Sequence, residues 1–315
     1  MLKTMVDWLV YKKLGFNLNS VSGEAFNFFV YDTIKIFLLL TVIIFAVSFI
    51  RTFFPPERSR KILGSGNRIK GSVLAGLLGI VTPFCSCSAV PLFLGFIEAG
   101  VPMGTTFTFL VASPMINEVA LVMLWGLFGW KIACLYIGSG LLIAIGSGLV
   151  IGSLHLEHLV EKFDIKGASH FELEKQSFKQ KIHYARDYTG EILKTVGPYV
   201  ILGIGLGALM HGYIPAGFLA RYAGRDNLFA VPLVTLIGIP LYSNAAGMIP
   251  LVSVLTEKGV GMGTALAFMM AVTGLSLPEF LILKRVMKLK LLLIFASVVG
   301  TGIIITGYLF NFVIP

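Results

Sequence analysis

Two cysteines, Cys85 and Cys87, interrupt an apolar stretch within the motif Thr-Pro-Phe-Cys-Ser-Cys-Ser. In a regular helix, residues two apart point about 200° away from each other and cannot share a ligand, whereas in a turn they can converge. Thiolates are soft donors that suit soft, thiophilic species. The pair is therefore interpreted as a ligand for a substrate or metalloid; the alternative, two small residues packed at a helix break, stays open. The third cysteine, Cys134, lies in an ordinary apolar run, where packing is its expected role.

Two carboxylates stand in segments that are otherwise apolar. Glu118 follows Asn117 in the first half of the chain, and Glu279 lies in the second half. A carboxylate inside a membrane is costly and marks a candidate functional site. Both residues are predicted to carry protons or to contact substrate. For Glu279 the alternative is a hydrated position at the membrane surface, because Lys284 and Arg285 follow it closely.

Other polar residues cluster around the two proposed helix breaks. Their alternative role is to satisfy backbone groups that a break releases. Glu98 and Glu257 each precede a glycine that ends a short apolar segment, which favours positions at the membrane surface. The predicted substrate-binding residues are Cys85, Ser86, Cys87, Ser88, Asn117, Tyr242, Ser243 and Asn244.

Composition shows what kind of scaffold must hold these residues. Of 315 residues, 56% are hydrophobic and only 13% are charged, whereas a soluble chain carries about a quarter charged residues. Apolar runs of 18 or more residues recur, and in lipid such runs must be helices. The formal charge of +9 is assigned to loops that set membrane orientation, so nucleic acid is not an expected partner. No metal site or cofactor is expected. No nucleotide-binding Walker motif is present, so ATP hydrolysis is not expected. The protein is expected to be a transporter and not an enzyme.

The sequence contains an internal repeat. Pro91–Thr105 (PLFLGFIEAGVPMGT) and Pro250–Thr264 (PLVSVLTEKGVGMGT) align without gaps and match at eight positions. Around them, Thr82–Cys87 is set against Ile239–Asn244, and Glu118 is set against Glu279. Chance similarity between apolar helices does not explain a Glu, a Met and a Thr in register, so two copies of one membrane unit are predicted.

Each unit is expected to contain three full spans and one broken hairpin. Ile69–Thr82 and Ala89–Ala99 are too short to cross a bilayer core of about 30 Å, and a Pro/Ser/Cys turn joins them, which predicts a re-entrant helical hairpin. The span Thr105–Phe128 is expected to be interrupted at Ser113-Pro114. The remaining predicted spans are Ile34–Ile50 and Ile132–Ile151 in unit one and Ile192–Met210 in unit two. The predicted domains are an interfacial segment (1–32), repeat 1 (33–153), a polar cytoplasmic linker (154–190) and repeat 2 (191–315).

Basic residues indicate the orientation of the two units. Arg51–Lys70 carries six Lys and Arg residues, whereas its counterpart His211–Asn227 carries two. Trp125–Lys131 carries one, whereas its counterpart Lys284–Lys290 carries four. Loops rich in Lys and Arg face the cytoplasm. In each pair of equivalent loops only one is basic, so the two loops of a pair are expected on opposite sides of the membrane. This relation defines an inverted repeat. The scheme places the N-terminal segment outside in spite of its three lysines.

The segment Thr82–Leu121 contains the motifs T-P-F-C-S-C-S, G-x-P-x-G and S-P-x-x-N-E, and the chain resembles the permeases of the YraQ/ArsP type. That family includes efflux permeases for trivalent organoarsenicals. The resemblance covers both units and implies a multi-pass permease of a prokaryotic inner membrane, without implying its substrate.

Together these features predict a secondary-active permease that exports a small solute by alternating access, with proton coupling through Glu118 or Glu279. Its expected partners are the solute and membrane lipid. The oligomeric state stays open, with a homodimer as one alternative. Two alternatives stay open: a membrane-embedded thiol oxidoreductase that uses Cys85 and Cys87, and a channel.

Overall fold

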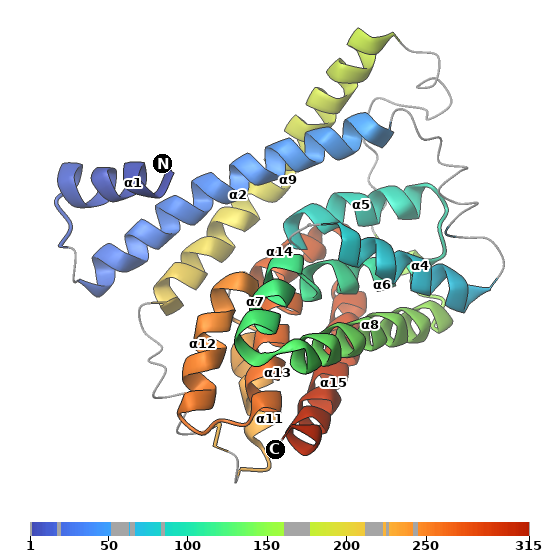
Figure 1. Ribbon diagram of the computed structural model, residues 1–315. Helices are drawn as coiled ribbons and strands as arrows, with labels where there is room; N and C mark the ends of the chain where they lie inside the picture. The colour runs from blue at the N-terminus through green and yellow to red at the C-terminus, as the bar shows by residue number, and fades with distance from the viewer. Residues whose placement is uncertain are drawn as a thin grey trace.

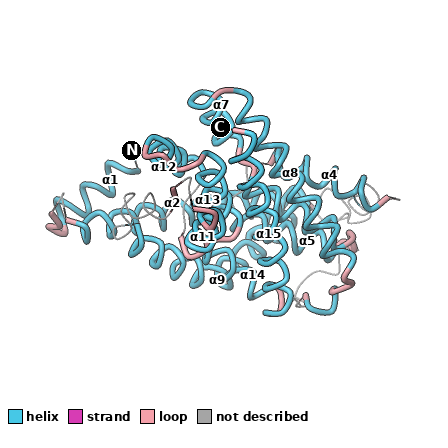
Figure 2. The backbone as a smooth tube through the Cα atoms, turned by 90° about the horizontal axis from the view of Figure 1, so that it is seen from below, coloured by secondary structure: helices cyan, strands magenta, loops and turns pink. Residues whose placement is uncertain are grey.

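The computed structural model describes residues 2–17, 20–51, 63, 67–82, 86–160, 177–211, 223–224, 227–241 and 245–314. Within these ranges the regular elements are helices (Figures 1 and 2), and β-structure is limited to two isolated bridges. The described part of the chain is therefore helical, with apolar helices compatible with the membrane protein that the composition predicts. The elements are α1 (Leu2–Asp7), η1 (Trp8–Lys13), α2 (Val21–Arg51), α4 (Arg68–Val81), α5 (Ser86–Glu98), α6 (Met103–Met115), α7 (Glu118–Phe128), α8 (Trp130–Ser153), η2 (Glu157–Leu159), α9 (Phe178–His211), α11 (Ala230–Gly238), α12 (Ala245–Glu257), α13 (Met262–Gly274), α14 (Leu277–Val286) and α15 (Leu289–Val313).

Two described helices, α8 and α15, are long and apolar enough to cross a membrane. The number rises to four if each bent pair, α6 with α7 and α13 with α14, is one span. This count covers the described residues alone. Helices α2 and α9 are not among the four, so the spans predicted within them stay predictions.

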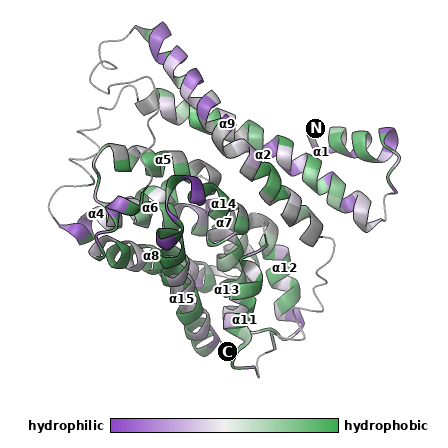
Figure 3. Ribbon diagram, turned by 180° about the vertical axis from the view of Figure 1, so that it is seen from behind, coloured by the Kyte–Doolittle hydropathy of each residue, from purple (hydrophilic) through white to green (hydrophobic). Residues whose placement is uncertain are grey.

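The long helices α2 and α9 form an antiparallel pair beside the main bundle (Figure 1). Phe37 of α2 lies against Gly197 of α9. Further along, the rings of Phe49 and Phe178 pack edge to face with centroids 5.6 Å apart. Helix α9 begins inside the predicted polar linker and continues into the predicted second repeat, and its first turns are hydrophilic while later turns are apolar (Figure 3). The domain boundaries proposed from sequence therefore stay predictions.

The main bundle contains two similar groups of helices. Helix α6 packs between α4 and α8, and α13 packs between α11 and α15. A Cβ added to Gly79 would lie 2.9 Å from the Cβ of Ala112, and a Cβ added to Gly238 would lie 2.9 Å from the Cβ of Ala271. Glycine therefore permits the same close helix contact at equivalent positions of both groups.

Two contacts join equivalent positions of the two groups directly. A Cβ on Gly302 of α15 would lie 3.1 Å from Ile143 of α8, and a Cβ on Gly274 of α13 would lie 2.8 Å from Met115 of α6. Each glycine aligns with its partner when the repeats are aligned without gaps. Contacts between equivalent positions are typical of elements that surround a pseudo-two-fold axis.

The direction of α4 is fixed by its contacts with α6. Gly71, near the start of α4, lies beside Thr105, and Gly79, near its end, lies beside Ala112. The two helices therefore run in the same direction. Because only a short turn over residues 99–102 joins α5 to α6, the end of α5 lies where α6 begins. Gly100 in this turn has φ of 74°, a left-handed conformation that favours glycine.

The break in the predicted span Thr105–Phe128 lies later than the sequence indicates. Ser113 and Pro114 belong to the last turn of α6, and the helix ends at Met115. Proline has no backbone N–H and so removes one helical hydrogen bond, yet α6 continues for one residue beyond Pro114. The chain instead breaks at Asn117, which can cap a new helix.

The glycine contacts allow a test of the packing. The substitution Gly148→Ala is expected to lower stability by about 1–3 kcal/mol, because its Cβ would overlap the Thr108 hydroxyl and the Gly104 carbonyl. Gly146, on the same helix, has open space around its Cβ position, so Gly146→Ala is the matched control and should leave the thermal midpoint nearly unchanged. Equal midpoints for both variants in detergent would contradict this packing.

Candidate functional site

The candidate site is the pair of breaks where α6 meets α7 and α13 meets α14. The chain bends by 52° at the first break and by 44° at the second. Met115, at the end of α6, packs on Gly274, at the end of α13. The two breaks therefore lie next to each other inside the bundle, and each is followed by a short helix with a carboxylate in its first turn.

At the first break, Asn117 caps the start of α7. Its side-chain Oδ1 accepts a hydrogen bond from the amide of Ala120 at 3.1 Å. Glu118 is the first residue of α7 and is partly exposed. A negative charge at this end of a helix is stabilised by the helix dipole.

At the second break, the amide of Leu277 donates to the carbonyl of Ile239, at the end of α11, with a distance of 2.8 Å. This bond ties the tip of the second short apolar helix to the start of α14. Glu279 lies in the first turn of α14 and its side chain is 0% exposed. Full burial within the protein weighs against a hydrated position at the membrane surface for this carboxylate.

The helix starts correct the alignment of the carboxylates. Helix α7 begins at Glu118, whereas α14 begins at Leu277. Glu118 therefore corresponds to Leu277 and not to Glu279, so the two carboxylates stand at different depths within their helices.

Sequence reasoning missed Tyr136. This residue of α8 is fully buried, and its hydroxyl donates to the main-chain carbonyl of Met115. The carbonyls at the end of a helix have no partner within that helix, so Tyr136 satisfies one that the break releases. Its only signal in the sequence is a tyrosine in the middle of an apolar span.

Each helix that follows a break packs on the other group of helices. Helix α7 contacts α12, and α14 contacts α5. Helices α5 and α12 are the second arms of the two predicted hairpins. Glu118 is therefore carried by a helix that touches the hairpin of the second repeat, and Glu279 by a helix that touches the hairpin of the first.

The predicted hairpin tips fall mostly outside the described residues. Ser86, Cys87 and Ser88 form the backbone of the first turn of α5, while residues 83–85 and 242–244, which include Cys85, Tyr242, Ser243 and Asn244, lie outside those ranges. Helices α5 and α12 begin at Ser86 and Ala245, so the motif match of Thr82–Cys87 with Ile239–Asn244 is shifted by two residues from the register of the helices. Among the described residues, no three His, Cys, Asp or Glu side chains are grouped as metal ligands would be.

Residues 22–312 match the model of one protein family, ArsP_1, which is described as a predicted permease. A Streptococcus mutans protein, named as a candidate subunit of a two-component membrane permease complex, is 29% identical over 85% of this chain and 87% of its own length. The UPF0718 proteins of Methanocaldococcus jannaschii and of Escherichia coli (YraQ) are each 24% identical over 82% of this chain, and over 87% and 73% of their own lengths. No solved structure matches the chain.

Proposed function

Since the chain belongs to the ArsP_1 family of predicted permeases, we propose that it is a secondary-active permease that exports a small solute across the cytoplasmic membrane of a prokaryote by alternating access. The family makes it a multi-pass membrane transporter. The mechanism, the direction and the coupling are the proposal.

The observation that carries the mechanism is the meeting of two helix breaks, each followed by a carboxylate. Broken helices place unsatisfied backbone groups and helix dipoles at a central site, and many secondary transporters bind substrate there. The contact of Met115 with Gly274 puts both breaks at one place. The buried carboxylate of Glu279 fits the role of a group that binds and releases a proton.

The inverted relation of the two repeats is supported by the order of their contacts. The first half of α6 lies beside Gly148 of α8, and in that half Phe107 packs on Phe295 of α15, with ring centroids 5.9 Å apart. In the alignment of the repeats, Phe295 corresponds to Tyr136, which lies at the other end of α6, beside Met115. The starts of α8 and α15, which are equivalent, thus lie at opposite ends of α6. This arrangement is expected when the two repeats have opposite orientations in the membrane.

The re-entrant hairpin is supported by the direction of three helices. Because α4 and α6 run in the same direction and α5 ends where α6 begins, α4 starts on the same side as α5 ends. The α4–α5 pair then enters and leaves on one face, with its tip near the break between α6 and α7.

The predicted cytoplasmic side is supported by contacts that connect the two basic loops. The amide of Lys288, in the second basic loop, donates to the carbonyl of Leu159, just beyond the end of α8, at 2.8 Å. Arg68, at the end of the first basic loop, lines a cavity with His155, from the same segment beyond α8. Both basic loops therefore border one face, which the positive-inside rule assigns to the cytoplasm.

Substrate and assembly follow as further parts of the proposal. The cysteine pair at the first hairpin favours a thiophilic metalloid or a sulfur-containing solute. A relative carries the name of one subunit of a two-component permease complex, so a second, different subunit is a candidate partner, beside the homodimer.

The function is tested by flux. Purified protein in sealed proteoliposomes with an acidic interior should accumulate a trivalent organoarsenical against its concentration gradient. When an ionophore collapses the pH gradient, the rate should fall to that of vesicles without protein. Inorganic arsenate, which carries no thiophilic centre, is the matched control solute. Transport that is equally fast without a proton gradient, and never uphill, would indicate a channel instead.

A further inference from the structure

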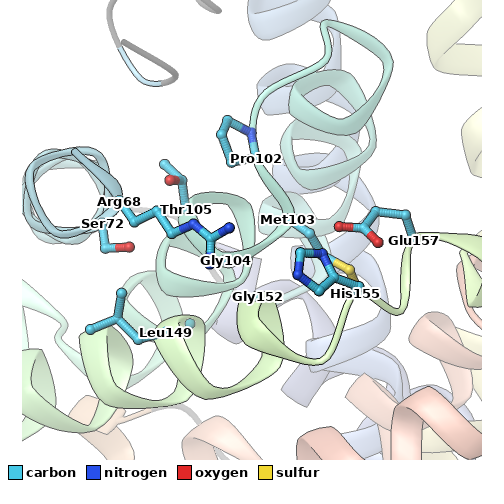
Figure 4. Close-up of a pocket in the computed structure, with 11 residues that line it drawn as sticks. Arg68, Ser72, Pro102, Met103, Gly104, Thr105, Leu149, Gly152, His155 and Glu157 are labelled. Carbon is cyan, nitrogen blue, oxygen red and sulfur yellow. The ribbon is translucent and has the colours of Figure 1, made fainter. Parts of the chain in front are cut away.

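A cavity of about 100 Å³ opens on the face that carries the basic loops, at the ends of α4, α6 and α8 (Figure 4). Arg68 reaches from the first turn of α4 over the start of α6, and His155 and Glu157 lie on the opposite side of the cavity. The floor is formed by residues near the start of α6 and by Gly148 and Gly152 of α8. The cavity is remote from both helix breaks.

Two largely buried side chains on the wall of this cavity carry hydroxyls that have no hydrogen-bond partner among the described residues. Ser72 of α4 is 1% exposed and Thr105 of α6 is 3% exposed, and neither hydroxyl makes a hydrogen bond in the part of the chain that the structure describes. Their neighbours on α6 differ, since the hydroxyls of Thr106 and Thr108 donate to the carbonyls four residues earlier, at 3.2 and 2.9 Å. The lining of the cavity therefore includes two hydroxyls that are available to a ligand.

The second repeat shows what the equivalent groups bind. There Asn311 of α15 lies against the start of α13. Its Oδ1 accepts from the amide of Thr264 at 3.2 Å, and its Nδ2 donates to the hydroxyl of Thr264 at 2.9 Å. Thr264 corresponds to Thr105, and Asn311 corresponds to Gly152, which has no side chain. The first repeat thus presents the same helix start to an open cavity. At the equivalent place the second repeat supplies, from its own chain, an acceptor oxygen for the Thr264 amide and a donor nitrogen for the Thr264 hydroxyl.

The charges around the cavity indicate the class of acceptor. The first amides of α4 and α6 have no acceptor within their own helices, and a helix start attracts negative charge. The guanidinium of Arg68 matches the geometry of phosphate and related oxyanions. Glu157 lies on the opposite side and opposes an anion, so its charge should weaken binding without preventing it.

We propose that this cavity is a binding site for a phosphate-class oxyanion, held by Arg68, Ser72, Thr105 and the start of α6. The anion is either a free inorganic phosphate or the phosphate of an anionic lipid headgroup, because the cavity lies at a membrane face. The site is separate from the proposed transport pathway, and its test does not depend on transport.

The test compares Arg68→Gln with Lys70→Gln in purified protein in a neutral detergent. Both changes remove one exposed positive charge from the first turn of α4, but Lys70 does not line the cavity. The thermal midpoint is measured against rising inorganic phosphate at constant ionic strength. In parallel, retention of phosphatidylglycerol is measured by native mass spectrometry after reconstitution with phosphatidylcholine and phosphatidylglycerol.

A free phosphate site predicts that phosphate stabilises the wild type and Lys70→Gln, with apparent affinity reduced about tenfold or more in Arg68→Gln. A lipid site predicts the same pattern for retained phosphatidylglycerol, with no response to phosphate. Glu157→Gln should tighten whichever ligand binds. An equal loss in Arg68→Gln and Lys70→Gln, or no response to either ligand in the wild type, would overturn the proposal.

Discussion

Glu279→Gln is expected to reduce proton-driven transport by about 100-fold or more while the protein still folds and inserts. The side chain is fully buried in the first turn of α14, and glutamine keeps its shape but cannot release a proton. If Glu279 is a coupling group, the variant should still exchange labelled for unlabelled solute, because exchange needs no net proton movement. Uphill transport and exchange should therefore separate.

Two further variants sharpen this test. Glu118→Gln changes a carboxylate that is only partly exposed at the other break, and should also lose uphill transport if both groups take part. Glu257→Gln changes an exposed carboxylate that accepts a hydrogen bond from Ser253 at 3.3 Å, and should transport normally. If the Glu279→Gln variant still carries out uphill transport, and the pH dependence of that transport is unchanged, Glu279 has no part in proton coupling.

The double substitution Cys85→Ser with Cys87→Ser is expected to reduce transport of a trivalent organoarsenical by about tenfold or more, through a higher KM. Serine is nearly isosteric with cysteine but is a hard donor, so the hairpin should fold while its affinity for a thiophilic centre is lost. Initial rates in proteoliposomes over a range of solute concentrations measure this change.

Cys134→Ser is the control, because Cys134 is exposed on α8 and far along the chain from the hairpin. It should leave the rates unchanged. Normal transport by the double variant would show that the two cysteines only fill space. Recognition would then rest on Asn117, Glu118, Ser243 and Asn244.

The sequence predicted most of the helices because their lengths and apolar runs are local properties. Helices α8 and α15 are uninterrupted and apolar, and the segment rich in Pro, Ser and Cys lies between the end of α4 and the start of α5. The contact of Gly104 on α6 with Gly148 and Gly152 on α8 is a property of close helix packing, which a single sequence does not reveal.

The break in α6 was predicted too early because proline was given more weight than asparagine. Pro114 fits in the final turn of a helix, whereas Asn117 can start the next helix by accepting the amide of Ala120. Sequence patterns identify the residue that disfavours a helix more readily than the one that caps the next.

The burial of Glu279 and the role of Tyr136 were not predictable, because both depend on helices that are distant in sequence. Helix α14 packs on α9 and α5, and α8 packs on the end of α6. The cavity at Arg68 was missed for a related reason. Its signal is the exchange of Asn311 for Gly152 between the repeats, which becomes meaningful only when Asn311 is seen to bond Thr264.

The orientation of equivalent turns tests the central architectural claim most directly. Single cysteines are introduced into a cysteine-free background at Ala99 and Lys258, which occupy equivalent turns after α5 and α12, and at Trp130 and Lys288, which start α8 and precede α15. A membrane-impermeant thiol reagent added to intact cells should label positions 258 and 130, and should label positions 99 and 288 only after the membrane is opened. Labelling of positions 99 and 258 from the same side would contradict the inverted repeat and the alternating-access permease built on it.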